Sequence, residues 1–267
     1  MTLAFPRTKI THDSNKPPDL VIRSHFLDLE STEYDCPYIT WSGESYSVKP
    51  RKGSQPLLAL ETAYSDDKNS IYFPYICFES SATKPQSFTS KKYCCAFAFS
   101  NPVLSRERVF LSLRRIEPLC YSFGKSCYTN DNPYELPNRH TNRETFRDFA
   151  FSIAMENVQK PGYITEKIGF AFESGTVPIY NSNNGVDRFF NRESFFDIDS
   201  YASNDAVAEA VVQIWKDTQK LQKYLDAPAI INDNLSQYQN LDQVTADEPR
   251  AWMVPFIDCL RQTFKDH

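Results

Sequence analysis

The chain has 267 residues, of which 41% are hydrophobic and 14% aromatic, so it is long enough to fold as two modest domains or one large one. This composition excludes a disordered chain. A net charge of -5 argues against a nucleic-acid-binding surface, so any phosphate-binding site must depend on a few local cations.

Targeting signals and metal-binding patterns are missing from the sequence. No stretch approaches the roughly 18 to 20 apolar residues that span a bilayer, so the chain as written is expected to be soluble and cytoplasmic. The seven cysteines are odd in number and include no Cys-x-x-Cys pair, and the four histidines have no ligand spacing. We therefore expect reduced thiols and no metal site.

Three short strands are predicted in the amino-terminal part. Residues 19–24 and 38–41 are strand-like runs, and the second is followed at once by Ser42, Gly43 and Glu44. Glu44 thus lies just past the end of a strand, a position that suits a functional carboxylate. The alternative interpretation is a solvated glutamate in a turn. Residues 71–78, which include Pro74, predict a third strand or a sheet-edge segment. The Lys-, Ser- and Pro-containing residues between these runs are interpreted as loops.

A strand over residues 93–100 and a helix over residues 103–115 are predicted next. Arg106 falls in the first turn of this helix, at the edge where the preceding strand ends. A guanidinium suits a diphosphate at such an edge because it can make paired hydrogen bonds. The alternative is an ordinary exposed helix arginine.

Residues 149–180 predict a strand, a polar loop, a helix and a second strand. The first strand covers 149–155 and ends at Glu156 and Asn157, the helix covers 165–174 with Thr165 as N-cap and Gly175 at its end, and the second strand covers 176–180. This βαβ order implies a parallel sheet with ligands at the carboxyl ends of its strands. Lys167, in the first turn, favours a phosphate-bearing ligand there, although a loop that merely caps a surface helix is the alternative.

The remaining residues are interpreted as scaffold. Asp197 and Asp199 resemble a metal-binding Asp-x-Asp pair but are expected to be structural, at the end of a strand over 194–198. Amphipathic helices are predicted over 206–225 and 252–264, with a loop-rich stretch over 226–246.

The string ENVQKPGYITEKIGFAFESGTVPIYNS, residues 156–182, closely resembles the signature of the α1,3/1,4-fucosyltransferases. That signature is Glu-Asn, a short spacer, Tyr-Ile/Val-Thr-Glu-Lys, a helix, and then Thr-Val/Ile-Pro. Two further parts are similar to the family: residues 40–47 with 71–75, and Asn101-Pro102 followed by Arg106 and Glu117-Pro118. The resemblance runs from about residue 19 to residue 202.

The resemblance implies an α/β fold of the GT-B type, with two Rossmann-like domains built on parallel sheets. The expected ranges are 1–90 for an acceptor-side domain, 91–245 for a domain that binds GDP-fucose, and 246–267 for a C-terminal helix. By this resemblance the first domain is expected to be shortened, because about 18 residues precede its first predicted strand where family members carry a further strand, helix and strand. Animal members are membrane-anchored Golgi proteins, so the chain is either a bacterial-like or virus-like cytosolic member or part of a longer protein.

The implied activity is inverting transfer of L-fucose from GDP-β-L-fucose to a hydroxyl of an oligosaccharide or glycoconjugate acceptor, in α1,3 or α1,4 linkage. The implied general base is Glu44. The implied donor-binding residues are Arg106 and Lys167 at the diphosphate, Glu166 at the ribose hydroxyls, and Asn157 and Tyr163 in the donor pocket. Glu156 either joins the site or orients Lys167.

No cofactor is required by this interpretation, with Mn²⁺ or Mg²⁺ as a stimulating ion at most. The alternative is a nucleotide-sugar or glycan-binding module that has lost catalysis, which the shortened first domain favours. Another glycosyltransferase with a different nucleotide sugar is the third reading.

Overall fold

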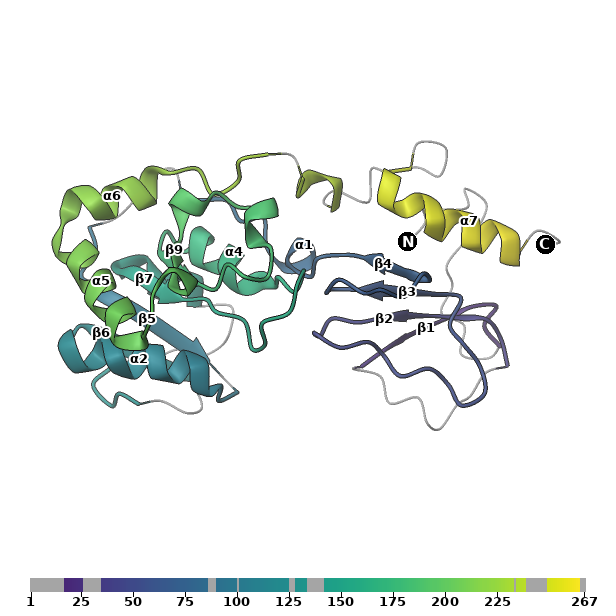
Figure 1. The fold of residues 1–267 in the computed structure, drawn as a ribbon, viewed down its shortest axis with the longest axis horizontal. Helices are drawn as coiled ribbons and strands as arrows, with labels where there is room; N and C mark the ends of the chain where they lie inside the picture. The colour runs from purple at the N-terminus through teal and green to yellow at the C-terminus, as the bar shows by residue number, and fades with distance from the viewer. Residues whose placement is uncertain are drawn as a thin grey trace. The chain divides into compact units, whose positions relative to one another are not determined.

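The computed structural model describes residues 17–25, 35–85, 90–99, 101–124, 128–133, 142–232, 234–238 and 249–264. The chain folds into two compact units (Figure 1). Unit 1 consists of Met1–Tyr75, Lys160–Tyr163 and Leu235–His267, and unit 2 consists of Ile76–Gln159 and Ile164–Asn234. Each unit is therefore assembled from segments that are separated in the sequence.

Unit 1 is built on a parallel sheet. Among its described residues the sheet has four strands in the order β1-β2-β3-β4, with bounds Val21–Ser24, Tyr38–Trp41, Leu58–Glu61 and Ser70–Tyr72. Helix α7, Val254–Thr263, follows a short 3-10 turn at Ala251–Met253 and packs on this sheet (Figure 1). Their shared core contains Ile39, Leu58, Ile71, Met253, Phe256, Ile257 and Leu260.

Two predictions for unit 1 are wrong. Strand β3 lies in a stretch interpreted as a loop, because its residues Leu-Ala-Leu-Glu favour helices and give no local strand signal. The extended conformation is imposed by pairing with β2 on one side and β4 on the other. The strand expected over 71–78 ends at Tyr72, and helix α1, Ile76–Glu79, follows Pro74, which cannot donate to a sheet ladder.

Unit 2 is built on a second parallel sheet. Over its described ranges, the sheet has five strands in the order β6-β5-β7-β8-β9. Their bounds are Tyr93–Phe99 for β5, Cys120–Gly124 for β6, Phe149–Ile153 for β7, Val177–Tyr180 for β8 and Phe196–Asp197 for β9. The strand order reverses between β5 and β7, and ligands of open parallel sheets bind beyond the carboxyl ends of the strands at such a reversal.

Helices cover the sheet of unit 2. Helices α2, Leu104–Ile116, α5, Asn204–Lys216, and α6, Thr218–Asp226, share one core cluster with the strands. Helix α4, Glu166–Glu173, contacts β8 and α1, while the short α3 spans Asn142–Thr145. Together with the parallel sheets, this arrangement confirms the predicted α/β class. Within the described ranges, no helix is long and apolar enough to cross a membrane.

Most boundaries in unit 2 agree with the sequence predictions to within two residues, including those of β5, α2, β7, α4 and β8. Two do not. The helix predicted over 206–225 is broken at Asp217, whose extended backbone ends α5 and whose side chain accepts a hydrogen bond from the Lys220 N–H at the start of α6. The strand predicted over 194–198 shrinks to β9, because 3-10 turns flank it at Arg192–Ser194 and Ile198–Ser200.

Candidate functional site

The carboxyl edge of the unit 2 sheet collects the predicted donor-binding residues of that unit. Arg106 lies in the first turn of α2, directly after β5, and Asn157 follows β7. Glu166 and Lys167 form the first turn of α4, whose amino terminus lies at the same edge because α4 leaves β7. A helix amino terminus with nearby cations is suited to binding an anion.

The carboxylate of Glu156 is the centre of a buried hydrogen-bond network. Glu156 is 4% exposed and accepts from the Thr165 backbone N–H at 2.7 Å, the Thr165 hydroxyl at 2.8 Å and the Tyr180 hydroxyl at 3.0 Å. Asn184 in turn donates to the Tyr180 hydroxyl at 3.0 Å. Thr165 occupies the N-cap position as predicted, but its hydroxyl serves this network and does not cap the helix.

Lys167 is fixed at the edge of this network. Its ammonium donates to Glu156 at 3.1 Å and to the Thr165 hydroxyl at 2.8 Å, and it lies 3.8 Å from a carboxylate oxygen of Glu166. Burial lowers the pKa of Lys167, but the charges of Glu156 and Glu166 outweigh burial and leave the pKa raised. Lys167 therefore keeps its positive charge at neutral pH. Glu156 orients it, which is one of the two roles that the sequence predicted for Glu156.

Arg106 supplies a second cation to the same edge. It is 4% exposed, and its guanidinium donates to the carbonyl oxygen of Asn101 at 2.9 Å. Its charge acts on Lys167 in the direction that lowers the lysine pKa. Both residues lie in the first turns of helices that follow the adjacent strands β5 and β7, so both cations stand at one edge of the sheet. Two cations at the amino termini of helices that share one sheet edge match the charge of a diphosphate better than that of a single carboxylate.

Glu44 and Tyr163 belong to unit 1. Glu44 follows β2, and its backbone carbonyl accepts from the hydroxyls of Ser42 at 3.0 Å and Thr62 at 2.8 Å. The Tyr163 hydroxyl lies 3.4 Å from a carboxylate oxygen of Glu44. The structure thus brings Tyr163 to the predicted base and Glu166 to Lys167, and it places Arg106 at the same sheet edge as Lys167.

Several polar residues at the carboxyl edge of the unit 1 sheet were missed by sequence reasoning. Glu61 ends β3 and is 5% exposed; burial raises its pKa above the ordinary 4.5, while Ser47, Lys160 and His25 act to lower it. His25 follows β1 and contacts the Ser42 hydroxyl at 3.2 Å. Recognising β3 as a strand would have placed Glu61 at the same edge as Glu44.

Asp197 and Asp199 have structural partners. Asp197 accepts from Arg192 and the Ser182 hydroxyl, and Asp199 accepts from the backbone N–H groups of Ser182 and Asn183. These contacts support the expected structural role of the pair. In the described part of the chain, no cluster of three or more His, Cys, Asp or Glu side chains is arranged to hold a metal ion.

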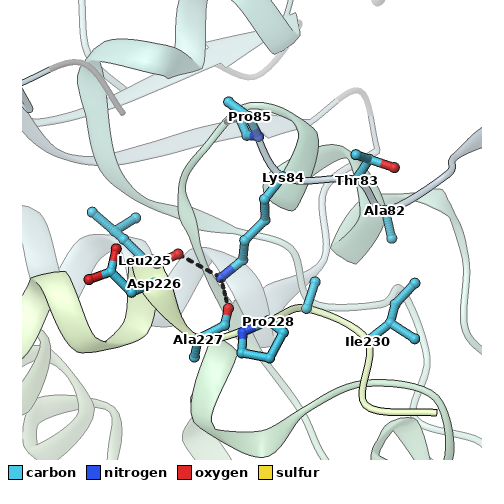
Figure 2. Close-up of a pocket in the computed structure, with 10 residues that line it drawn as sticks. Ala82, Thr83, Lys84, Pro85, Leu225, Asp226, Ala227, Pro228 and Ile230 are labelled. Carbon is cyan, nitrogen blue, oxygen red and sulfur yellow. Dashed lines mark hydrogen bonds between the residues drawn. The ribbon is translucent and has the colours of Figure 1, made fainter. Parts of the chain in front are cut away.

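A hollow of about 430 Å³ in unit 2 lies outside this site (Figure 2). It is lined by residues of two segments, 82–85 and 225–230. The Lys84 ammonium donates to the carbonyl oxygens of Tyr224, Leu225 and Ala227 at 2.9, 3.1 and 2.6 Å, and burial lowers its pKa to about 8. Lys84 thus satisfies the carbonyl end of α6, and none of the predicted site residues lines this hollow.

Solved structures of an α1,3-fucosyltransferase share the fold. The structure with GDP matches with a TM-score of 0.65 and 18% identity, over 94% of this chain and 81% of that one. The structure with GDP-fucose matches with a TM-score of 0.65 and 17% identity, over 92% and 79%. The fold is therefore the two-unit glycosyltransferase fold that the resemblance implied.

The sequence comparison assigns the family. Residues 87–229, more than half of the chain, match the model of glycosyltransferase family 10 (fucosyltransferase), C-terminal part. The chain belongs to this family.

Individual relatives are similar at a moderate level. The α-(1,3)-fucosyltransferase FucT of Helicobacter pylori is 28% identical over 207 residues, which cover 74% of this chain and 42% of the relative. The human 3-galactosyl-N-acetylglucosaminide 4-α-L-fucosyltransferase FUT3 is 28% identical over 194 residues, which cover 67% and 51%. The chain spans about half the length of the curated relatives it matches.

Proposed function

We propose that the chain is an inverting fucosyltransferase that moves L-fucose from GDP-β-L-fucose to a hydroxyl of a glycan acceptor. The observation that carries this proposal is the placement of two cations, Lys167 and Arg106, in the first helical turns that follow strands β7 and β5, where the strand order of unit 2 reverses. Family membership and the GDP and GDP-fucose complexes of the structural relatives support the choice of donor.

The proposed reaction is a single displacement. The acceptor oxygen forms a bond to the anomeric carbon of fucose while the bond from that carbon to the diphosphate oxygen breaks. Glu44 takes the proton of the acceptor hydroxyl, and Lys167 and Arg106 compensate the charge that develops on departing GDP. Inversion converts the β-linked donor into an α-linked product.

The finer assignments within this proposal follow from the resemblance. Glu166 accepts hydrogen bonds from the ribose hydroxyls, and Asn157 and Tyr163 line the donor pocket. An N-acetylglucosamine-containing acceptor is proposed because relatives such as FUT3 are named for acting on galactosyl-N-acetylglucosaminides. We propose that no metal ion is needed, because the two cations meet the charge of the diphosphate.

The first test is release of GDP from GDP-fucose in the presence of N-acetyllactosamine, lactose and N-glycan-core acceptors, with EDTA or Mn²⁺. Release that depends on one of the acceptors and persists in EDTA is the expected result. Calorimetric binding of GDP in preference to UDP is expected in parallel. Binding of GDP without release on any acceptor would favour a binding module that has lost catalysis.

Lys167→Ala should lower turnover by roughly 10² to 10³, the scale of losing one charge-stabilising donor in a transition state. Lys220→Ala, at an exposed lysine of α6, is the matched control and should leave turnover unchanged. Unchanged turnover in Lys167→Ala would contradict its assignment to the diphosphate.

Glu44→Gln keeps the shape of the side chain but removes its ability to accept a proton. It should abolish transfer while leaving the calorimetric affinity for GDP near that of the wild type. Near wild-type activity in this variant would show that another group is the base.

A further inference from the structure

The segment 160–163 belongs to unit 1, although it lies within the loop between β7 and α4 of unit 2. It is held in unit 1 by backbone and side-chain contacts. The Tyr64 backbone N–H donates to the Pro161 carbonyl at 2.9 Å, and the Tyr72 hydroxyl donates to the Gly162 carbonyl at 2.8 Å. These contacts fix the positions of the side chains at both ends of the segment, Lys160 and Tyr163.

Gly162 allows the close approach on which this placement depends. Its backbone has φ +80°, in the left-handed region that glycine adopts without strain. A Cβ atom at this position would lie 2.9 Å from the Tyr64 backbone nitrogen and 3.0 Å from its ring. The segment is therefore closely packed against unit 1.

Lys160 reaches the loop that carries Glu44. Its ammonium donates to the carbonyl oxygen of Ser45, the residue after Glu44, at 2.7 Å. The carboxylate of buried Glu61 is close enough for the charge of Lys160 to act on it. Lys160 thus holds the loop that follows β2.

Three hydroxyl groups contact Glu44 directly. Ser42 and Thr62 hold its backbone carbonyl, and the Tyr163 hydroxyl faces one oxygen of its carboxylate at 3.4 Å. That separation is long for a hydrogen bond between two oxygens, but contacts at catalytic groups commonly tighten when substrate binds. Only one carboxylate oxygen is engaged by Tyr163, and the other can accept the proton of an acceptor hydroxyl.

We propose that Lys160 and Tyr163 are positioning residues for the general base Glu44: Lys160 fixes the backbone of its loop, and Tyr163 orients its carboxylate. This inference rests on the proposed function, because it assigns partners to the base of that reaction. It gives Tyr163 a role beyond the donor pocket, and it gives a role to Lys160, a residue that the family signature does not specify.

The test separates positioning from binding by measuring kcat, KM and the calorimetric Kd for GDP. Lys160→Met keeps the aliphatic stem and removes the ammonium, and we expect a loss in kcat of roughly ten- to a hundredfold, because small displacements of a catalytic group are that costly. The Kd for GDP and the KM for GDP-fucose should stay within about twofold. Lys160→Arg retains a donor and should restore most of the lost kcat.

Tyr163→Phe removes only the hydroxyl and should lower kcat by about tenfold without changing the Kd for GDP. Tyr38→Phe is its matched control, because the Tyr38 hydroxyl is also bonded within unit 1 but at the opposite end of β2, to Ser54 and Arg51. Lys52→Met, at an exposed lysine of unit 1, is the control for Lys160. Both controls should keep the wild-type kcat.

The outcomes distinguish this inference from the proposed function. If the wild type is active and Glu44→Gln is not, wild-type kcat in Lys160→Met and Tyr163→Phe would overturn the inference and leave the function standing. Weaker GDP binding with unchanged kcat in Tyr163→Phe would assign its hydroxyl to the donor and overturn its positioning role. If the wild type releases no GDP with any acceptor, the proposed function fails and the inference fails with it.

Discussion

At the scale of single residues, Glu156 organises the carboxyl edge of the unit 2 sheet through its hydrogen bonds. A buried carboxylate is stable only when its oxygens are hydrogen-bonded and its charge is paired. Thr165 and Tyr180 provide the hydrogen bonds and Lys167 the opposite charge. The same contacts hold the start of α4 and orient the Lys167 side chain. The same atoms therefore contribute both to the stability of the fold and to the geometry of the candidate site.

Glu156→Gln should therefore destabilise unit 2. The substitution leaves the Lys167 ammonium without its main counter-charge and places amide hydrogens where acceptors are needed. We expect a loss of about 3 kcal/mol in the free energy of unfolding, the lower end for breaking a buried ion pair, because the lysine side chain is 23% exposed. Urea unfolding would measure it, with Glu193→Gln on the exposed surface as the control. Equal stability of the two variants would contradict this account.

Glu61 should make stability depend on pH. Burial raises its folded-state pKa above the ordinary 4.5, so the folded protein holds the proton more tightly than the unfolded chain. Its contribution to the free energy of unfolding is therefore greatest at low pH and falls as the pH rises through the raised pKa. Glu61→Gln lacks this fall, so its stability relative to the wild type should increase with pH.

Urea unfolding of both proteins at a series of pH values between about 4 and 8 would show this trend. Glu209→Gln, on the exposed face of α5, should give a difference from the wild type that does not change with pH. A difference that decreases with pH for Glu61→Gln would mean that its charged form is the one favoured by folding.

At the scale of elements, α4 packs so closely on the segment after α1 that one position must be glycine. A Cβ atom on Gly169 would lie 2.0 Å from Oγ and 2.6 Å from Cβ of Ser80. Ser80 cannot easily move, because its hydroxyl donates to Glu173 at 2.8 Å and Glu173 also accepts from the Ser81 backbone N–H at 2.9 Å. The last turn of α4 is therefore tied to the segment it packs on.

Gly169→Ala should lower the free energy of unfolding by about 1 to 3 kcal/mol, because overpacking outweighs the gain of about 1 kcal/mol in helix propensity. Ser80→Gly removes the clashing atoms, so the double variant should recover most of the loss relative to Ser80→Gly alone. A double-mutant cycle from thermal or urea unfolding measures this coupling. Additive losses would show that the two residues do not interfere.

Some elements were predicted from the sequence and others were not. The predicted ones are specified by the pattern of their own residues, whereas the others depend on contacts with distant residues. β5, β7 and α4 carry long apolar runs or helical spacing, and their bounds were found to within two residues. β3 is a strand only because two neighbours pair with it. The break between α5 and α6 depends on a side chain that caps one turn, while the apolar spacing continues across it.

The same distinction applies to the site. The order of residues around Lys167 and Arg106 follows from strand, loop and helix positions, and the sequence is enough to predict that they share an edge. The connections of Lys160 to Ser45 and of Glu156 to Tyr180 join residues far apart in the chain. No local pattern specifies such contacts, because they depend on how the strands are ordered in the sheet.

At the scale of the whole molecule, each unit has its own hydrophobic core. A substitution that creates a cavity in one core should therefore lower the stability of that unit selectively. Leu260 of α7 is 6% exposed in the core of unit 1, and Leu225 of α6 is 4% exposed in that of unit 2. Replacement of either by Ala should cost about 2 to 5 kcal/mol. Hydrogen exchange by mass spectrometry should show faster exchange in β2 and β3 for Leu260→Ala, and in β5 and β7 for Leu225→Ala.

The two variants serve as controls for each other, because they make the same chemical change in different units. Faster exchange throughout both units in either variant would show that the units unfold together. The comparison therefore measures how independent the two cores are.

The assignment of α7 to unit 1 sets an order in which the protein can fold as it is made. The strands of unit 1 leave the ribosome before unit 2, but Phe256, Ile257 and Leu260, which cover their apolar face, leave it after unit 2. Unit 2 is complete by Asn234, so the later-starting unit can fold before the earlier one. During that interval the apolar face of the nascent unit 1 sheet is exposed, because α7 has not yet been made. A chain released before α7 is complete would keep this face exposed to solvent.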